Sequence, residues 1–456
     1  MRGKRRSLVE WGKNALIVLL SISALGLLWQ TRFYGTMAEG ASGPVGALLS
    51  MLPGEEEGAA AAGTDRTRGT TVYPVRMAVM SSQGRAGIQY DNEQVTQLFT
   101  DFSNPLAAAL AAAETPELST AEAFQAALQS RNPGVYLDFL GEVPLSNLAA
   151  WLGGAGSPEG ALSAVVRRLL LTVDGEGQVL LYYIDADTGL YYVSRTDPEL
   201  SARLERLVGS APQPNGAQFA FEAGEGYSAL DPYTMLEGGA APRPSRYTAT
   251  DPVPLSGNGE NGYGAAFEAL VSKLSFHPQS MSYPSRDSSV VVQEGSERLR
   301  IYSDGQVIYD PTEEGTGRYP IQGIGEDLTL WEAVGSAWSF VDGALSDLCG
   351  EARLYLMDVE ATGEGRLTVR FGYQMDGAAV FVGQDGYAAQ VEISGGEISA
   401  YHLQLRSYAY LDEGPAIMPE LQAAAALGAL DGEGLELMIC YPDSRGDTVA
   451  AAWGAF

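Results

Sequence analysis

Residues 14–31 read NALIVLLSISALGLLWQT, eighteen residues without a charge, and five basic residues lie between positions 2 and 13. At about 1.5 Å per residue a helix of this length spans about 27 Å, close to the thickness of a hydrocarbon core. Trp29, Phe33 and Tyr34 then supply the aromatic belt of a membrane interface. The stretch predicts a transmembrane helix with a cytoplasmic N-terminus and an extracytoplasmic body after Arg32.

Two other interpretations of this stretch stay open. A cleavable signal peptide would use Thr36-Met37-Ala38 as its small-x-small site, although bulky residues at 32–34 intervene and the apolar run is long for such a signal. A buried core helix is the second alternative. We adopt the retained anchor, which places the protein in the cell membrane as a single-pass protein.

One face of the expected helix is a candidate partner-binding site. Spacings of three and four place Asn14, Ile17, Ser21, Ala24 and Leu28 on that face. Two helices in lipid approach closely through small residues and hydroxyl groups, which Ser21 and Ala24 provide. We predict that this face packs against a partner's transmembrane helix. Small residues can also occur in an anchor by composition alone, and no G-x-x-x-G is present.

Composition limits what the rest of the chain can bind. The chain has 28 Lys+Arg against 57 Asp+Glu and a net charge of −29, and its basic N-terminus makes the remainder more acidic still. Such a body repels nucleic acid and anionic lipid headgroups, so we predict no nucleic-acid partner. With 45% hydrophobic and 9% aromatic residues, it is expected to fold into a core.

Cysteine usage excludes two classes of site. Only Cys349 and Cys440 are present, too few for a disulfide scaffold or a cysteine-cluster metal site. Outside the cytoplasm the two could pair. Two separate buried thiols are the favoured alternative.

Domain boundaries follow from composition shifts. Residues 35–71 are small and polar, and seven of the 23 prolines fall between positions 212 and 254. The predicted organisation is a cytoplasmic tail (1–13), a transmembrane helix (14–31), a flexible tether (32–71), an N-terminal α+β domain (72–210), a Pro/Gly-rich linker (211–262), a middle α+β domain (263–326) and a C-terminal α+β domain (327–456).

Local patterns predict the elements of this body. Asp91 and Gln94 resemble a capping box before a helical apolar pattern, and Ser119 with Glu122 repeats that signal. Residues 135–139 alternate apolar with polar, which predicts a half-buried strand with Tyr136 and Asp138 on its outer face. Further helices are expected at 144–152, 197–207, 263–274, 327–348 and 416–430. Further strands are expected at 165–173, 178–184, 190–194, 288–294, 298–303, 306–309, 352–360, 365–373, 378–382, 388–393, 397–411, 434–441 and 447–453.

These elements define the expected fold class. We predict an α+β protein in which an N-terminal transmembrane helix precedes an extracytoplasmic multi-domain body of antiparallel sheets with helices packed on one face. Residues 263–456 are expected to form two related units of this kind.

No catalytic, cofactor or metal site is predicted. His277 and His402 lie in different units, as a turn and a strand-face histidine. The G-x-G-x-x-G at 257–262 follows a Pro-rich loop instead of a strand and contains an acidic residue, so we interpret it as linker. The calcium-like run 185–189 is favoured as a hairpin turn, and Arg445-Gly446-Asp447 as a turn between the last strands.

Several stretches, in order along the chain, carry a family resemblance. They are the anchor with its aromatic exit, Val72-Tyr73-Pro74, Gly134–Phe139 with Val143-Pro144, Phe371-Gly372-Tyr373, the strands between Ala389 and Tyr410, and Ala451-Ala452-Trp453. In these the chain resembles the YycH/YycI family, membrane-anchored regulators of the WalK sensor histidine kinase in Gram-positive bacteria.

The resemblance implies a function and partners. It implies a non-enzymatic regulator of a two-component system in cell-wall homeostasis, with a WalK-type kinase and a YycI-like protein as partners. An anchored or secreted cell-envelope hydrolase is the alternative from another class. The chain has many carboxylates, and their number alone does not exclude a catalytic pair of the glycosidase type. An envelope scaffold or inhibitor module is the third.

Overall fold

The computed structural model describes residues 72–153, 163–236, 242–255, 263–311, 318–321, 329–362, 365–429 and 434–456. The tail, transmembrane helix and tether expected in residues 1–71 lie outside these ranges. Within the described ranges, no helix combines the length and apolar composition that crossing a membrane requires. Tertiary contacts group Thr70–Phe456 into one unit, which contains every element below.

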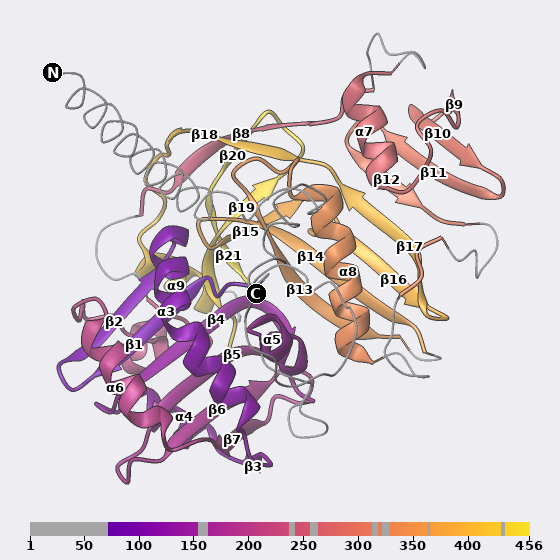
Figure 1. The fold of residues 1–456 in the computed structure, drawn as a ribbon. Coiled ribbons are helices and arrows are strands. Elements are labelled where there is room, and N and C mark those ends of the chain that lie inside the picture. Colours follow the sequence, from indigo (N-terminus) through magenta and orange to yellow (C-terminus); the bar gives the residue numbers. More distant parts are fainter. Residues whose placement is uncertain are drawn as a thin grey trace, which may run out of the picture. The chain divides into compact units, whose positions relative to one another are not determined.

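The N-terminal part of this unit is built on an antiparallel sheet of seven strands (Figure 1), in the order β2-β1-β4-β5-β6-β7-β3. The meander expected at 165–194 is confirmed as β5, β6 and β7. The bounds of the strands are β1 (Arg76–Ser81), β2 (Gly84–Gln89), β3 (Glu117–Leu118), β4 (Gly134–Pro144), β5 (Val165–Val173), β6 (Val179–Asp185) and β7 (Tyr191–Arg195).

Helices cover both faces of this sheet, which corrects the expectation of helices on one face. On one face α3 (Asn92–Ala111), α5 (Leu145–Trp151) and α6 (Leu200–Ser210) share a core with alternate strand residues such as Val135. On the other face α4 (Ala121–Gln129) packs with Tyr136 and with side chains of residues 219–235. The strand predicted as half-buried is therefore buried on both sides.

Helix starts follow the predicted caps to within one residue. The Asp91 carboxylate accepts a hydrogen bond from the Gln94 backbone N–H at 2.9 Å, so α3 begins as predicted. The cap of α4 is Thr120 instead of Ser119, because the Thr120 hydroxyl accepts from the Ala123 N–H at 3.2 Å.

The rest of the chain builds a sheet of eleven strands, in the order β21-β19-β15-β14-β16-β17-β12-β11-β10-β9 with β13 beside β14. All pairs are antiparallel except β15 with β19, which is parallel. The bounds are β9 (Met281–Pro284), β10 (Ser289–Glu294), β11 (Glu297–Tyr302), β12 (Gln306–Tyr309), β13 (Arg353–Ala361), β14 (Leu367–Met375), β15 (Ala378–Val382), β16 (Ala389–Ser394), β17 (Glu397–Gln404), β19 (Leu437–Asp443) and β21 (Ala452–Ala455).

Two helices cover one face of this second sheet. They are α7 (Ala265–Lys273) and α8 (Leu330–Leu345), which contact each other. A capping box starts α8, and its Trp338 ring lies 5.6 Å from the ring of Phe371 in β14. Because β12 pairs with β17, the sheet runs across the boundary predicted at residue 326. The expected middle and C-terminal units therefore share one sheet.

A third, three-stranded sheet lies partly in the predicted linker. Its order is β18-β8-β20, with β8 (Ser245–Thr250), β18 (Ser407–Glu413) and β20 (Thr448–Ala450). The same stretch contains short 3-10 helices at Ala220–Glu222 and Glu225–Tyr227, which lie near α9 (Glu420–Gly428). The prolines thus mark a long connection, and some of its residues, such as Phe219, Tyr233 and Tyr247, are buried in the body.

The N-terminal sheet docks on the face of the second sheet that lies opposite α8. Val75 and Leu140 form a small core with Tyr355, Ala379 and Met438. Between β4 and β13 the backbones approach so closely that a Cβ on residue 141 would overlap a carbonyl oxygen of β13, which glycine avoids. The interface between the two sheets is therefore close-packed.

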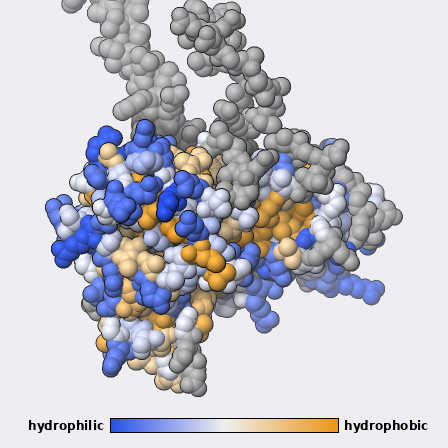
Figure 2. All heavy atoms as spheres, turned by 90° about the horizontal axis from the view of Figure 1, so that it is seen from below, coloured by the Kyte–Doolittle hydropathy of each residue, from blue (hydrophilic) through white to orange (hydrophobic). Residues whose placement is uncertain are grey.

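Hydrophobic residues also reach the surface. On the face drawn in Figure 2 they gather in patches bordered by hydrophilic residues. The most exposed large hydrophobic side chains include Leu118 (70%), Met281 (69%) and Tyr410 (55%). Patches of this kind on a folded domain often mark binding surfaces.

Candidate functional site

The predicted partner-binding face of the anchor cannot be placed. Asn14, Ile17, Ser21, Ala24 and Leu28 all lie outside the described residues. That face stays a prediction. The candidate site within the body comes from a different feature, a buried group of charges between the two sheets.

The centre of this group is Asp138 in β4. Its carboxylate accepts hydrogen bonds from Arg76 Nη1 at 3.0 Å and from Arg167 Nε at 2.9 Å. It also accepts from the backbone N–H of Leu140 at 3.0 Å, and Leu140 has a φ of 68°. Asp138 therefore binds two guanidinium groups and also stabilises the left-handed residue at which β4 bulges toward the second sheet.

The second acid of the group comes from the other sheet. Glu436 directly precedes β19, and its carboxylate lies 2.6 Å from Arg76 Nη1, 2.6 Å from Arg167 Nη2 and 2.9 Å from Arg168 Nη2. Three arginines of β1 and β5 thus converge on one carboxylate of the C-terminal segment. We call Arg76, Asp138, Arg167, Arg168 and Glu436 the inter-sheet charge cluster.

Burial and charge act against each other in the cluster, and charge dominates. Burial alone would raise the pKa of Asp138, but Arg167, Arg76 and Arg168 hold that pKa well below its usual range. The pKa of Glu436 is lowered in the same way, against its own burial. Both acids are therefore ionised at neutral pH and already bound to cations, a state that suits structural pairing better than proton transfer.

A small cavity of about 160 Å³ adjoins the cluster. It is lined by Arg167, Arg168, Ile184, Ala186, Asp231, Gly434, Glu436 and Phe456. Asp231 takes a hydrogen bond from Arg168 Nη1 at 2.8 Å, so with Asp138 and Glu436 three acids balance the three arginines. The balanced charge leaves this cavity without a strong preference for anions or cations.

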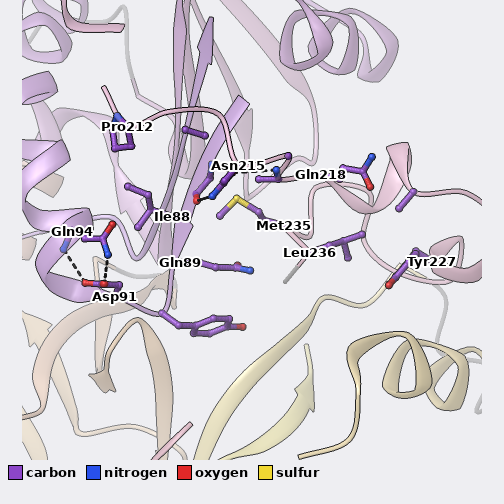
Figure 3. Close-up of a pocket in the computed structure, with 16 residues that line it drawn as sticks. Ile88, Gln89, Asp91, Gln94, Pro212, Asn215, Gln218, Tyr227, Met235 and Leu236 are labelled. Carbon is purple, nitrogen blue, oxygen red and sulfur yellow. Dashed lines mark hydrogen bonds between the residues drawn. The ribbon is translucent and has the colours of Figure 1, made fainter. Parts of the chain in front are cut away.

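A larger cavity, of about 880 Å³, follows the outer edge of β2 (Figure 3). It is lined by Ala86, Gly87, Ile88, Gln89, Tyr90, Asp91, Gln94, Pro212, Asn215, Gly216, Ala217, Gln218, Ala223, Tyr227, Met235 and Leu236. The Asn215 side chain donates to the Gly87 carbonyl at 2.7 Å and accepts from the Gly87 N–H at 3.0 Å. Asn215 therefore occupies the open edge of β2 as a neighbouring strand would.

The other sequence motifs that fall in the described residues take the places expected for them. His277 is exposed, and His402 lies in β17, where its Nδ1 is 2.8 Å from the Tyr387 hydroxyl oxygen. Cys349 and Cys440 are both buried and unpaired. The calcium-like run joins β6 to β7 as a hairpin turn. The G-x-G-x-x-G run at 257–262 lies outside the described residues.

Sequence reasoning missed the charge cluster. Asp138 was placed on an exposed strand face, whereas its side chain is almost fully buried. The available signal was a charge flanked by apolar residues at the start of a strand, as at Arg76, or inside one, as at Asp138 and the pair Arg167-Arg168. A charge at such a position is stable only when buried partners neutralise it.

Comparisons with known proteins give one match. No protein-family description matches the chain, and no curated protein is similar in sequence. Among solved structures, the chain is similar to the crystal structure of YycH from Bacillus subtilis, with a TM-score of 0.49, 12% identity, and coverage of 84% of this chain and 93% of that one.

Proposed function

We propose that this chain is a non-enzymatic, membrane-anchored regulator whose extracytoplasmic body and anchor bind a WalK-type sensor histidine kinase and a YycI-like companion. The proposal rests on the ordered sequence stretches that resemble the YycH/YycI family. The main supporting observation concerns the stretch Gly134–Phe139, which is part of that resemblance. It forms the first part of β4 and supplies the aspartate at the centre of the inter-sheet charge cluster.

A second resembling stretch also serves the packing of the fold. Phe371-Gly372-Tyr373 lies in the middle of β14. A Cβ at Gly372 would overlap the ring of Tyr355, one of the residues on which the N-terminal sheet docks. Both stretches therefore support the junction of the two sheets. A firmly joined body of this kind suits a protein that acts by binding.

Membrane topology is the first test. Protease added to intact cells after wall removal should degrade the body and spare the basic N-terminus, because the positive residues before the anchor favour the cytoplasm. A protected body would contradict both the extracytoplasmic location and the proposed regulation.

Contact through the anchor is the second test. Replacing Ser21 and Ala24 together with leucine should weaken crosslinking of the full chain to the kinase, by about 1 to 2 kcal/mol if one hydrogen bond and its packing are lost. Ser23 and Gly26 fall on the opposite side of the predicted helix. Their double leucine variant is therefore the matched control, and it should crosslink like the original chain.

The outcomes separate the anchor from the regulatory role. If the Ser21 and Ala24 variant crosslinks as well as the original, the anchor face is not the contact and the body must be tested. If the original chain neither crosslinks to the kinase nor changes its autophosphorylation in reconstituted membranes, the proposed function is wrong.

A further inference from the structure

Within the described ranges, other elements cover the outer face of the second sheet only at one end. At β13, β15 and β19 the side chains of Tyr355, Ala379 and Met438 are buried against the N-terminal sheet. On the opposite face, α8 contacts β13 and β16, and α9 shares a small core with Leu437 of β19. At the other end of the outer face, formed by β9 to β12, no described element packs across the strands in this way.

Strand registry identifies the side chains of this uncovered end. Tyr283 pairs with Val291, Val291 with Arg300, Arg300 with Ile308, and Ile308 with His402. Registered partners in antiparallel strands have their side chains on the same face. One row across four strands and into β17 therefore places an aromatic ring, aliphatic groups, a guanidinium and an imidazole on this face, although Val291 itself is buried.

The next row adds a second hydrophobic and a second cationic group. Met281 pairs with Gln293, and Gln293 with Arg298. Met281 is 69% exposed and Tyr283 38%, and both arginine side chains are exposed. Methionine, tyrosine and arginine are the residue types enriched in protein interfaces. We call Met281, Tyr283, Arg298, Arg300 and Ile308 the β9–β12 face.

The two arginines differ from Arg370, which lies on the same face of the sheet. Arg370 of β14 is held by Asp358 at 2.9 Å and by Glu360 at 3.0 Å. Among the described residues, neither Arg298 nor Arg300 has a salt-bridge partner, and Asp310 just after β12 forms none with them. In a chain with a net charge of −29, two unpaired guanidinium groups beside exposed hydrophobic side chains form a local cationic surface.

We propose that the β9–β12 face binds an acidic protein segment that also carries hydrophobic side chains. The same sheet face already makes such a contact inside the molecule, where apolar packing is joined by arginine–carboxylate pairs. Here the second sheet supplies the arginines, so the bound segment must supply the acids. A second copy of this acidic chain or an anionic membrane would be repelled by the rest of the body.

Binding of a defined probe tests the proposal without any assumption about the proposed kinase. The full chain in detergent is titrated against a labelled peptide of glutamate, tyrosine and glycine, and against the same peptide with glutamine in place of glutamate. The acidic peptide should bind at least about tenfold more tightly, and added salt should weaken it.

Charge reversal locates the contact. The double variant Arg298→Glu and Arg300→Glu should lower the affinity for the acidic peptide at least about tenfold. The matched control is Arg203→Glu with Arg206→Glu, which reverses two exposed arginines of α6 and should leave the affinity unchanged. Tyr283→Ser tests the hydrophobic part of the face, and it should also weaken binding.

Each remaining outcome would overturn the proposal. Equal affinity of the charge-reversal variant and the original chain, with the same thermal midpoint, would place the acidic peptide elsewhere. Dimers in sedimentation that only this variant lacks would make a second copy the occupant. Displacement of the peptide by short-chain phosphatidylglycerol, with the same dependence on the two arginines, would make a lipid headgroup the occupant.

Discussion

Glu436→Gln tests whether the inter-sheet charge cluster holds the two sheets together. The substitution keeps the shape of the side chain and removes its charge. Glu436 faces three guanidinium groups at 2.6 to 2.9 Å and is almost fully buried. Without its charge, three arginines remain against Asp138 and the half-buried Asp231, so one buried positive charge is left uncompensated.

The expected loss of stability follows from that uncompensated charge. Removing one partner of a buried ion pair typically costs about 3 to 5 kcal/mol, whereas exposed pairs contribute about 1 kcal/mol or less. We therefore expect the free energy of unfolding of the full chain to fall by about 3 kcal/mol or more in urea titrations. Glu413→Gln, at an exposed position of β18, is the matched control and should leave the midpoint unchanged.

The contribution of Glu436 to stability should also appear in the dependence of unfolding on pH. Above the pKa of unfolded carboxyl groups, about 4, the acids are ionised in folded and unfolded chains, and the stabilisation is fully present. Below that pH, Glu436 and Asp138 bind protons in the unfolded chain but stay ionised in the folded chain. The free energy of unfolding therefore falls by about 1.4 kcal/mol per pH unit for each acid. The variant should lose part of this slope. A loss below about 1 kcal/mol at neutral pH, with an unchanged acid slope, would refute the role of the cluster.

Two further predictions concern packing and the cysteines. Gly141→Ala should destabilise the body by about 2 to 3 kcal/mol, because the new Cβ would overlap the Leu356 carbonyl oxygen, whereas Gly175→Ala, with open space around it, should leave the thermal midpoint unchanged. Burial raises the pKa of the Cys349 and Cys440 thiols to about 11. At pH 8 both should therefore react with a thiol reagent only after the chain unfolds. If a chain purified without reductant shows no reactive thiols after unfolding, the two cysteines are not free.

Local signals predicted most of the helices and strands. A cap such as Asp91 and a mostly apolar run such as residues 165–173 depend on neighbours a few positions away, so they can be recognised in one sequence. β8 was missed because its pattern, SRYTAT, is polar and lies among prolines. Its pairing partners, β18 and β20, follow it by more than 150 residues, and no local pattern identifies them.

The charge cluster could not be predicted for a related reason. Arg76 and Glu436 are 360 residues apart, and each is an ordinary charged residue in its own segment. Only the docking of the two sheets brings three arginines and two acids into one buried volume. A strand position such as Asp138 looks solvent-exposed because alternation alone does not say whether a second layer covers the polar face.

The cluster also bears on why the two sheets dock in one register. Apolar contacts such as those of Val75 and Leu140 tolerate small shifts, because the hydrophobic effect has no direction. A carboxylate that must reach three guanidinium groups tolerates far less, since a shift of one residue along β19 would move Glu436 away from all three. Buried charges of this kind add little net stability compared with a well-packed apolar interface, but they penalise the wrong arrangement strongly. We infer that the cluster selects the docking register of the sheets.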